Sequence, residues 1–291
     1  MKHIKECPLC GSQDHRLYLE TQDWFLTMEA FSIQECNACA FLFTNPIPEE
    51  MGSYYQSEDY LSHNASKKGL LSTLYRIIRL IALKKKYHQV KKHATGKNLL
   101  DIGCGTGEFL NYCQIQGMNT KGIEPGKQAR EFAKKQYNLE IDDEPALDNL
   151  PAGQYDVITL WHVLEHVPNL HQRMKTITSL IKDQGIIILA LPNPQSFDAE
   201  KYEKFWAAYD TPRHLYHFRK KNIETLAQQH NLKLLETVPM PFDAYYISLL
   251  SEKYKTGSQN FLKATINGCK SNMKGAKSKN HSSLTYILQK K

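Results

Sequence analysis

The chain of 291 residues is long enough for one large domain and a small one. Its composition, 41% hydrophobic and 23% charged, is typical of an ordinary soluble globular protein, and no apolar run reaches the length of a membrane span. The net charge of +7 is modest and gathers in Lys84–Lys92 and in the tail from Lys253, so it does not by itself indicate nucleic-acid binding. No secretory signal opens the sequence, and seven cysteines, an odd number, fit a reducing compartment, so we expect a cytoplasmic location.

Two C-x-x-C pairs stand near the start of the chain, and their four cysteines are Cys7, Cys10, Cys36 and Cys39. Each pair places two thiolates on one tight turn, and two such turns can complete a tetrahedral zinc site. Short strands are expected between them at Leu17–Leu19 and Phe31–Gln34. We therefore predict a zinc-ribbon module over residues 1–45 with a structural Zn²⁺. A redox C-x-x-C pair would not explain two copies, and a closed Cys₄ site leaves no position for catalysis.

Residues 46–97 are expected to form a linker, a cover segment and a helix. The tyrosine-rich stretch Tyr54–Tyr60 either covers a ligand cleft or packs between the two modules. From Leu70 to Ala94 apolar residues recur on one helical face, with basic residues elsewhere. Such a helix can lie on a membrane surface, but we favour packing beside the first strand of the large domain.

The most informative stretch reads NLLDIGCGTGEFL, from Asn98 to Leu110. An apolar run ending at Asp101 predicts a buried parallel strand, three glycines follow at every second position, and Glu108 opens a helical pattern. The register is not the G-x-G-x-x-G of dinucleotide sites, because Glu108 stands where the last glycine should be. Two carboxylates beside a phosphate would repel it, so the turn favours a cationic ligand.

This stretch resembles motif I of class I S-adenosylmethionine-dependent methyltransferases. The resemblance implies that Asp101 serves the cationic methionine end of S-adenosylmethionine. It also implies that the turn admits the body of the cofactor at Gly103, Cys104, Gly105 and Gly107. Glu124, which ends the next short strand, would accept hydrogen bonds from the ribose hydroxyls, and its alternative role is to cap the following helix. Strands and helices alternate onward, so we predict an α/β domain over residues 98–291. Its expected fold is a Rossmann-like, seven-stranded, mostly parallel sheet with helices on both faces.

The fourth strand, Tyr155–Leu160, ends at Trp161 and His162, which we expect to line the cofactor cleft. The run Leu164–Val167 resembles ubiquinone-pathway O-methyltransferases, in which a carboxylate, a Glu and a His hold a divalent ion. Here His162 stands at the position of that first carboxylate. We therefore expect Glu165 and His166 to cap and support the helix rather than to bind a metal.

After the fifth strand, Gly185–Leu191, an aromatic insertion at Phe197–Tyr209 is predicted to bind substrate. The following segment, Pro212–Phe218, resembles zinc-containing sugar C-methyltransferases, in which a His of this segment is a catalytic base. The resemblance implies that His214 is the base, with His162 a further catalytic candidate. Arg213, which replaces a Glu of that family, suggests an anionic acceptor.

The combined expectation is an S-adenosylmethionine-dependent methyltransferase with a structural zinc. Its acceptor would be a small molecule such as a sugar nucleotide or another surface-polysaccharide precursor. One alternative is an O-methyltransferase for a quinone or lipid-like acceptor, with peripheral membrane contact. Another is an RNA-modifying enzyme or zinc-ribbon nucleic-acid binder, although the basic runs lack the interleaved aromatic residues of a single-strand platform. The sequence leaves the oligomeric state open.

Overall fold

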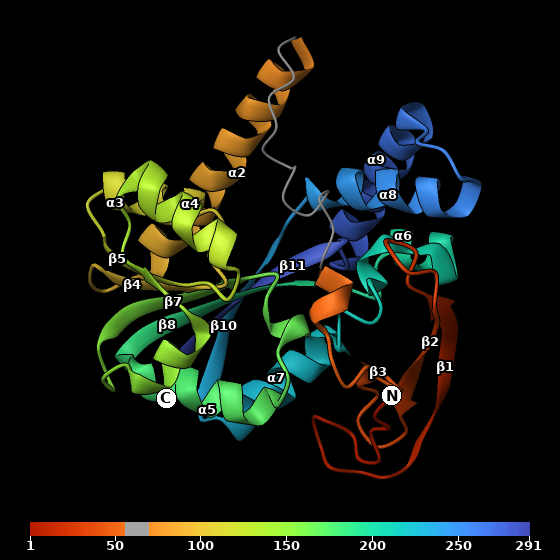
Figure 1. Cartoon of the computed structure of the whole chain (residues 1–291), viewed down its shortest axis with the longest axis horizontal. Coiled ribbons are helices and arrows are strands. Elements are labelled where there is room, and N and C mark those ends of the chain that lie inside the picture. Colours follow the sequence, from red (N-terminus) through yellow and green to blue (C-terminus); the bar gives the residue numbers. More distant parts are fainter. Residues whose placement is uncertain (56–69) are drawn as a thin grey trace.

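The computed structural model describes residues 1–55 and 70–291 and contains two β-sheets (Figure 1). The larger sheet has the strand order β10-β11-β8-β7-β4-β5-β6. The strands are β4 (Asn98–Ile102), β5 (Asn119–Ile123), β6 (Ile141–Asp142), β7 (Tyr155–Trp161), β8 (Ile181–Pro192), β10 (Leu232–Pro239) and β11 (Ser283–Lys290). β4, β5, β6, β7 and β8 pair in parallel, whereas β11 runs antiparallel to both β8 and β10. The predicted mostly parallel seven-stranded sheet is confirmed.

The central strands are buried on both faces, which is why they read as continuous apolar runs. In β4 the four residues from Leu99 to Ile102 are buried, and Ile102 lies beside Ile123 on one side and Leu160 on the other. The carboxyl ends of β4, β5 and β7 therefore meet at one edge. Ligands bind at this edge in open α/β sheets.

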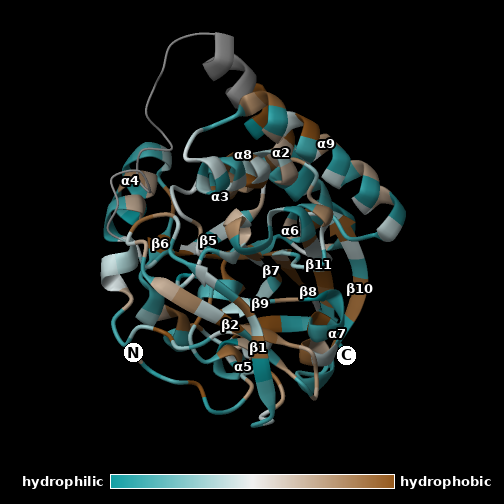
Figure 2. Cartoon of the chain, turned by 90° about the vertical axis from the view of Figure 1, so that its right-hand side faces the viewer, coloured by the Kyte–Doolittle hydropathy of each residue, from teal (hydrophilic) through white to brown (hydrophobic). Residues whose placement is uncertain are grey.

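Helices cover both faces of the sheet, as expected (Figure 1). One face carries α2 (Leu70–His93), α3 (Glu108–Ile115) and α4 (Lys127–Tyr137), and the other carries α5 (Leu170–Leu180) and α7 (Lys220–Gln229). The outer helices alternate hydrophobic and hydrophilic residues (Figure 2). Within the described residues, no helix combines the length and the apolarity that a membrane crossing requires.

The smaller sheet belongs to the N-terminal module but is completed from elsewhere. Its order is β1-β2-β3-β9, from β1 (His15–Gln22), β2 (Ala30–Cys36), β3 (Leu42–Thr44) and β9 (Tyr216–His217). In β9, Tyr216 pairs with Phe43 and His217 with Leu42. Residues far along the chain thus add an antiparallel strand to the 1–45 module.

The segment after β8 forms α6 (Phe197–Tyr202) and two single turns, Glu203–Phe205 and Ala207–Tyr209. We predicted a substrate-binding insertion here, but its large aromatic side chains pack inward. Trp206 is 1% and Tyr202 1% exposed, and the Trp206 Nε1 donates to Asp198 Oδ2 at 2.8 Å. These rings therefore form the core between the zinc module and the helices α8 (Asp243–Thr256) and α9 (Phe261–Ser278).

Of the predicted cover segment, Tyr54 and Tyr55 lie in a short turn, Gly52–Tyr55, while residues 56–60 lie outside the described residues. Tyr54 is 7% exposed and its ring contacts Phe31 of the zinc module. Of the two roles considered for this stretch, Tyr54 therefore shows packing against the N-terminal module. Two further turns, Glu144–Asn149 and Leu164–His166, follow β6 and β7.

Candidate functional site

The glycine turn after β4 adopts the conformation that only glycine takes without strain. Gly103, Gly105 and Gly107 have φ angles of +70°, +55° and +78°. A Cβ at Gly103 would lie 2.4 Å from Val163 Cγ2, and one at Gly107 would lie 2.7 Å from Leu139 Cδ1. A Cβ at Gly105 would meet nothing within 4 Å. Gly105 is thus the position at which the turn faces open space and a ligand can approach the backbone.

Two carboxylates flank this turn. Asp101 is buried, and its Oδ1 accepts a hydrogen bond from Thr159 Oγ1 at 2.6 Å. Burial raises the pKa of Asp101 to about 7, against the opposing effects of Thr159 and Lys86. Glu124 accepts from the backbone N–H of Gly105 at 2.7 Å and of Gly126 at 2.8 Å, and burial raises its pKa too. Because each Glu124 oxygen accepts one of these two hydrogen bonds, lone pairs remain for the hydroxyls of a ligand.

Lys86 on α2 lies at the same site, although no sequence motif predicted it there. Its Nζ is 4.5 Å from the centroid of the Trp161 ring, and neither a hydrogen bond nor an ion pair joins it to any described residue. Burial lowers the pKa of Lys86, while Asp101 and Asp243 raise it. Helical spacing could have identified Lys86, because it precedes the buried Val90 by four residues and so shares its inward face.

Cys104 and Trp161 also contribute to the edge. Cys104 is half-buried, and burial raises the pKa of its thiol, which therefore stays protonated. Trp161 packs edge-on against Phe109, with ring centroids 5.2 Å apart.

His162 lies between two carboxylates and is unsuited to be a free base. Its Nε2 is 3.0 Å from Asp243 Oδ2 and its Nδ1 is 3.4 Å from Glu165 Oε1. Burial lowers the pKa of His162, but these two partners outweigh it and raise the pKa to about 9. An imidazole with that pKa holds its proton at neutral pH, so we withdraw His162 as a base candidate.

Glu165, His166 and His214 form a buried cluster whose ligand atoms lie within 4.8 Å of one another. Glu165 is 0% exposed, and neither of its oxygens has a hydrogen-bond partner among the described residues. Glu165 and His166 do not cap α5 as expected, because Asn169 stands at its N-cap and both residues lie in the preceding short turn Leu164–His166. The prediction that no metal binds here stays a prediction, since a carboxylate and two imidazoles are also donors that transition metals accept.

Each of the two histidines of the cluster places its Nδ1 at a backbone carbonyl oxygen. His166 Nδ1 lies 3.1 Å from the Arg213 carbonyl oxygen, and burial together with His214 lowers the pKa of His166 to about 4. His214 Nδ1 lies 2.9 Å from the Ala208 carbonyl oxygen. A carbonyl only accepts, so the His214 Nδ1 is the donor of this hydrogen bond. His214 Nε2 is 3.9 Å from Asp210 Oδ2.

The charge of Arg213 is balanced inside the protein by two carboxylates, which contradicts its expected contact with an anionic acceptor. Its side chain is 1% exposed, and its Nη2 donates to Asp23 Oδ1 and Asp210 Oδ1, each at 2.7 Å. Its Nη1 donates to the Tyr54 carbonyl oxygen at 3.2 Å. Arg213 therefore joins the zinc module to the 210–214 segment, and its neighbour His214 is positioned by that contact.

The four predicted zinc ligands come together at the base of the module. The Sγ atoms of Cys7 and Cys39 are 3.6 Å apart, as are those of Cys10 and Cys36. Sulfur atoms bound at about 2.3 Å to one tetrahedral Zn²⁺ stand roughly 3.8 Å apart, so the arrangement fits zinc. Burial raises the pKa of Cys7 to about 12, and a metal must therefore displace protons to bind.

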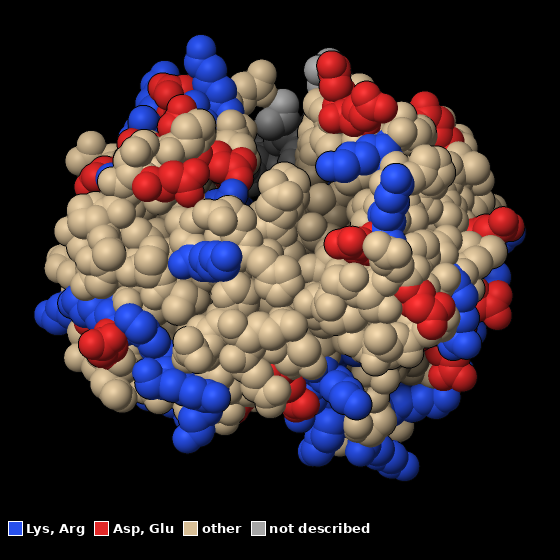
Figure 3. Space-filling view, turned by 90° about the horizontal axis from the view of Figure 1, so that it is seen from below, with Lys and Arg blue, Asp and Glu red and all other residues tan. Residues whose placement is uncertain are grey.

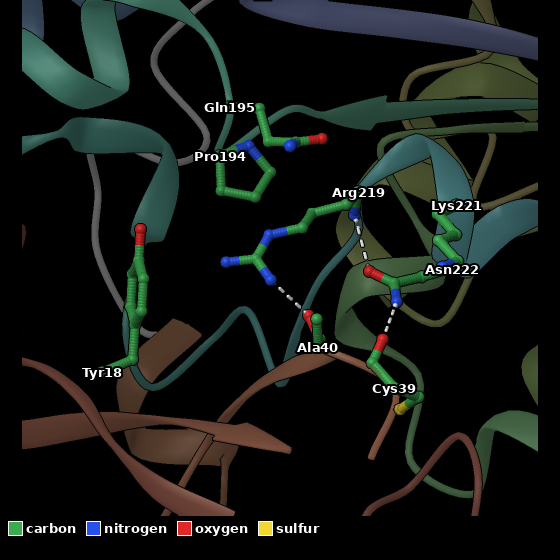
Figure 4. A pocket seen from close by; sticks show the side chains of 8 residues that line it. All are labelled: Tyr18, Cys39, Ala40, Pro194, Gln195, Arg219, Lys221 and Asn222. Atoms are coloured by element: carbon green, nitrogen blue, oxygen red, sulfur yellow. Dashed lines mark hydrogen bonds between the residues drawn. The ribbon is translucent and has the colours of Figure 1, made fainter. Parts of the chain in front are cut away.

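A pocket of about 490 Å³ lies where the second cysteine turn meets α7 (Figure 4). Arg219 Nη1 donates to the Ala40 carbonyl oxygen at 2.6 Å, and Asn222 Nδ2 donates to the Cys39 carbonyl oxygen at 3.0 Å. These bonds fasten the zinc module to the large domain. On the face shown in Figure 3, basic and acidic side chains are interspersed, without the continuous basic surface of a nucleic-acid groove.

The geometry agrees with comparisons to known proteins. The chain is 31% identical over 126 residues to a ubiquinone biosynthesis O-methyltransferase from Marinobacter nauticus, covering 40% of this chain and 53% of that protein. It is 27% identical over 188 residues to the protein of the same description from Dechloromonas aromatica, covering 59% and 78%. For the first of these relatives the chain thus spans about half of the relative's length.

Solved structures share the fold at low sequence identity. A magnesium protoporphyrin IX methyltransferase from Synechocystis, solved with bound SAH, aligns with a TM-score of 0.54 at 13% identity and covers 82% of this chain and 97% of that one. A protein from Pyrococcus horikoshii aligns with a TM-score of 0.54 at 14% identity, covering 83% and 100%. The family model described as a methyltransferase domain matches residues 75–237. The chain therefore belongs to the methyltransferase domain family, within the class I S-adenosylmethionine-dependent methyltransferases.

Proposed function

We propose that this protein transfers the methyl group of S-adenosylmethionine to a small-molecule acceptor. The observation that carries the proposal is the turn at the carboxyl end of β4, where Gly105 faces open space between Asp101, Glu124 and Lys86. Charges of both signs at one turn suit a ligand that carries a sulfonium, an ammonium and a carboxylate. When bound, the cofactor supplies an activated methyl group.

Each residue of the turn has a role that follows from its chemistry. Glu124, oriented by two backbone N–H groups, would accept hydrogen bonds from the ribose hydroxyls. Asp101 would face the cationic groups of the methionine end, and Lys86 its carboxylate. Trp161 and Cys104 would line the same space. In the zinc module, Cys7, Cys10, Cys36 and Cys39 would hold a structural Zn²⁺.

His214 is our candidate for the general base. Its Nδ1–H donates to the Ala208 carbonyl, which leaves Nε2 able to accept a proton from an acceptor. The buried Glu165 carboxylate of the same cluster stabilises positive charge on the histidines. Asp210 and Arg213 fix the segment that carries the imidazole.

Of the two acceptor classes, we favour a quinone or lipid-like molecule methylated on a hydroxyl oxygen over a sugar nucleotide. The relatives are described as O-methyltransferases of ubiquinone biosynthesis, and Arg213 is already paired with two carboxylates. Arg213 was the reason to expect an anionic acceptor beside His214, and its pairing with the two carboxylates removes that reason. Methylation of a sugar nucleotide remains the second candidate, supported by the combination of a Cys₄ module with His214.

Changing Lys86 to Met tests the cofactor assignment through the methionine end alone. Wild-type protein should bind both S-adenosylmethionine and 5′-methylthioadenosine, which lacks the amino-acid group. Lys86→Met should weaken the binding of S-adenosylmethionine roughly tenfold or more, which is the range of a hydrogen bond to a charged group. It should leave the affinity for 5′-methylthioadenosine unchanged. Calorimetric titration measures both affinities.

Lys84→Met, a change at an exposed neighbour on the same helix, is the matched control. If the wild-type protein bound neither compound, the proposed function would be wrong. Equal loss of both compounds in Lys86→Met would instead assign Lys86 a purely structural role.

A further inference from the structure

Helix α9 turns its small and polar residues toward the protein. Its buried residues are Ala264, Asn267, Gly268, Ser271 and Gly275. The Asn267 Nδ2 donates to the Tyr202 hydroxyl at 2.9 Å and to a Glu252 oxygen at 3.1 Å, and the Ser271 hydroxyl donates to Asp198 at 2.6 Å. The inward contacts of α9 are therefore partly hydrogen bonds between polar side chains.

The apolar side chains of α9 point outward instead. Leu262 is 72% exposed, Ile266 44% and Met273 69%. At 3.6 residues per turn these three side chains fall within an arc of roughly 40°, so they form one stripe along the helix. An ordinary surface helix buries such a stripe and exposes its polar side chains, so the orientation of α9 is inverted. Exposed apolar side chains arranged in this way are typical of a surface that binds an apolar partner outside the chain.

The charges of α9 identify that partner. The helix contains Lys263, Lys270, Lys274 and Lys277 and no acidic residue. By the same helical geometry, all four lysines fall along one side of the stripe. Two copies of α9 facing each other would bring like charges together, which opposes self-association. A surface with an anionic outer layer over an apolar interior would attract the lysines to the outer layer and the stripe to the interior.

A second apolar surface lies at the same end of the molecule. On α2, Ile77 is 49%, Leu80 51% and Ile81 39% exposed, and Lys84 of the next turn is exposed too. Figures 1 and 2 both place α2 and α9 at the upper end. Apolar residues on two separate helices at one end fit an extended surface better than the groove of a protein partner.

We propose that α9 lays its outward stripe on an anionic lipid bilayer, with the lysines at the headgroups and Leu262, Ile266 and Met273 among the upper acyl chains. This is peripheral binding in the plane of the membrane surface. It goes beyond the proposed function and depends on neither the cofactor nor the acceptor.

Sedimentation of the whole 291-residue chain, purified in the presence of Zn²⁺, with vesicles tests the proposal. The protein should co-sediment with vesicles of phosphatidylcholine mixed with phosphatidylglycerol, and far less with phosphatidylcholine alone. Each of Lys263→Gln, Lys270→Gln and Lys277→Gln should lower the partition coefficient about fivefold, the effect of one lysine near an anionic surface. Leu262→Gln with Met273→Gln should lower it at least as much.

Leu17→Gln is the matched control, because Leu17 is 52% exposed on β1 in the other sheet. Absence of binding to the anionic vesicles, or unchanged binding in the stripe and lysine variants, would overturn the proposal. So would a dimer in analytical ultracentrifugation that disappears in Leu262→Gln with Met273→Gln. The lysine variants keep the test decisive if the apolar variant does not fold.

Discussion

Two adjacent residues, Arg213 and His214, show what distinguishes a site residue from a structural one. The sequence predicted both at the acceptor, because they share one segment after the fifth strand. In the structure Arg213 turns inward to Asp23, a carboxylate 190 positions away in sequence, while His214 joins Glu165 and His166. No local pattern reveals a partner so distant, so the sequence located the segment but not the direction of each side chain.

At the residue scale, Asp101 should make cofactor binding depend on pH. Burial holds its pKa at about 7 in the free protein, and a cationic ligand favours the charged carboxylate. Below pH 7 binding must therefore displace a proton, and the affinity for S-adenosylmethionine should rise as the pH increases toward 7 and then level off.

Calorimetry in buffers of different ionisation enthalpy counts the released proton. Asp101→Asn should release none and should bind with an affinity that no longer changes over this range. An affinity of the wild-type protein that is flat from pH 5 to 8 would argue against Asp101 facing the cation.

His214 should matter for turnover and not for cofactor binding. With an acceptor that turns over, His214→Ala should lower kcat by roughly 10²–10⁴, the usual contribution of a general base. The affinity for S-adenosylmethionine should barely change, because the His214 ring contacts the Ala208 carbonyl and the His166 ring and not the glycine turn. His88→Ala, at an exposed histidine on α2, is the control. Wild-type turnover in His214→Ala would place the base elsewhere.

At the scale of elements, the sequence predicted the regular strands and helices well but missed the short contacts between modules. Apolar runs indicated β4 and β7, because that signal comes from neighbouring residues in the chain. The predicted fifth strand began at Gly185, whereas β8 begins at Ile181 because Tyr155 pairs with it there. β9 has two residues and exists only through its pairing with β3, so no local signal could indicate it.

Because β9 pairs with β3 of the N-terminal module, a Zn²⁺ held by the four cysteines would be coupled to the segment that carries His214. Cys10→Ser should lower the zinc content below one equivalent and the melting temperature, because the metal contributes folding free energy to so small a module. The loosened module should release Tyr216–His217 and reduce turnover, while S-adenosylmethionine affinity stays close to that of the wild type. Elemental analysis, thermal unfolding and calorimetry measure the three effects.

Cys269→Ser is the matched control, since Cys269 is an exposed free cysteine on α9, outside the metal cluster. Full zinc content in Cys10→Ser would contradict the assignment of the four cysteines. A loss of cofactor affinity as large as the loss of turnover would contradict the prediction that the cysteine cluster supports the His214 segment and not the cofactor site.

At the scale of the whole molecule, the N-terminal module is joined to the large domain by arginine and histidine side chains. Arg213 reaches Asp23, Arg219 reaches Glu35 and the Ala40 carbonyl, and His171 lies 3.1 Å from the Leu9 carbonyl oxygen. The sequence indicated two modules from the cysteine spacing and the glycine turn. It could not indicate how they join, because these contacts link residues more than 160 positions apart.

The measurement that most directly tests the central claim is the titration of S-adenosylmethionine into the wild-type protein and into Gly105→Val. A Cβ at Gly105 meets no protein atom within 4 Å, so a valine there should extend into the space assigned to the cofactor. Gly153→Val controls for backbone strain, because Gly153 has a similar φ of +62° and equally open surroundings. We expect one equivalent of cofactor to bind to the wild type and to Gly153→Val, and no measurable binding to Gly105→Val. Unchanged affinity in Gly105→Val would show that the glycine turn is not the cofactor site.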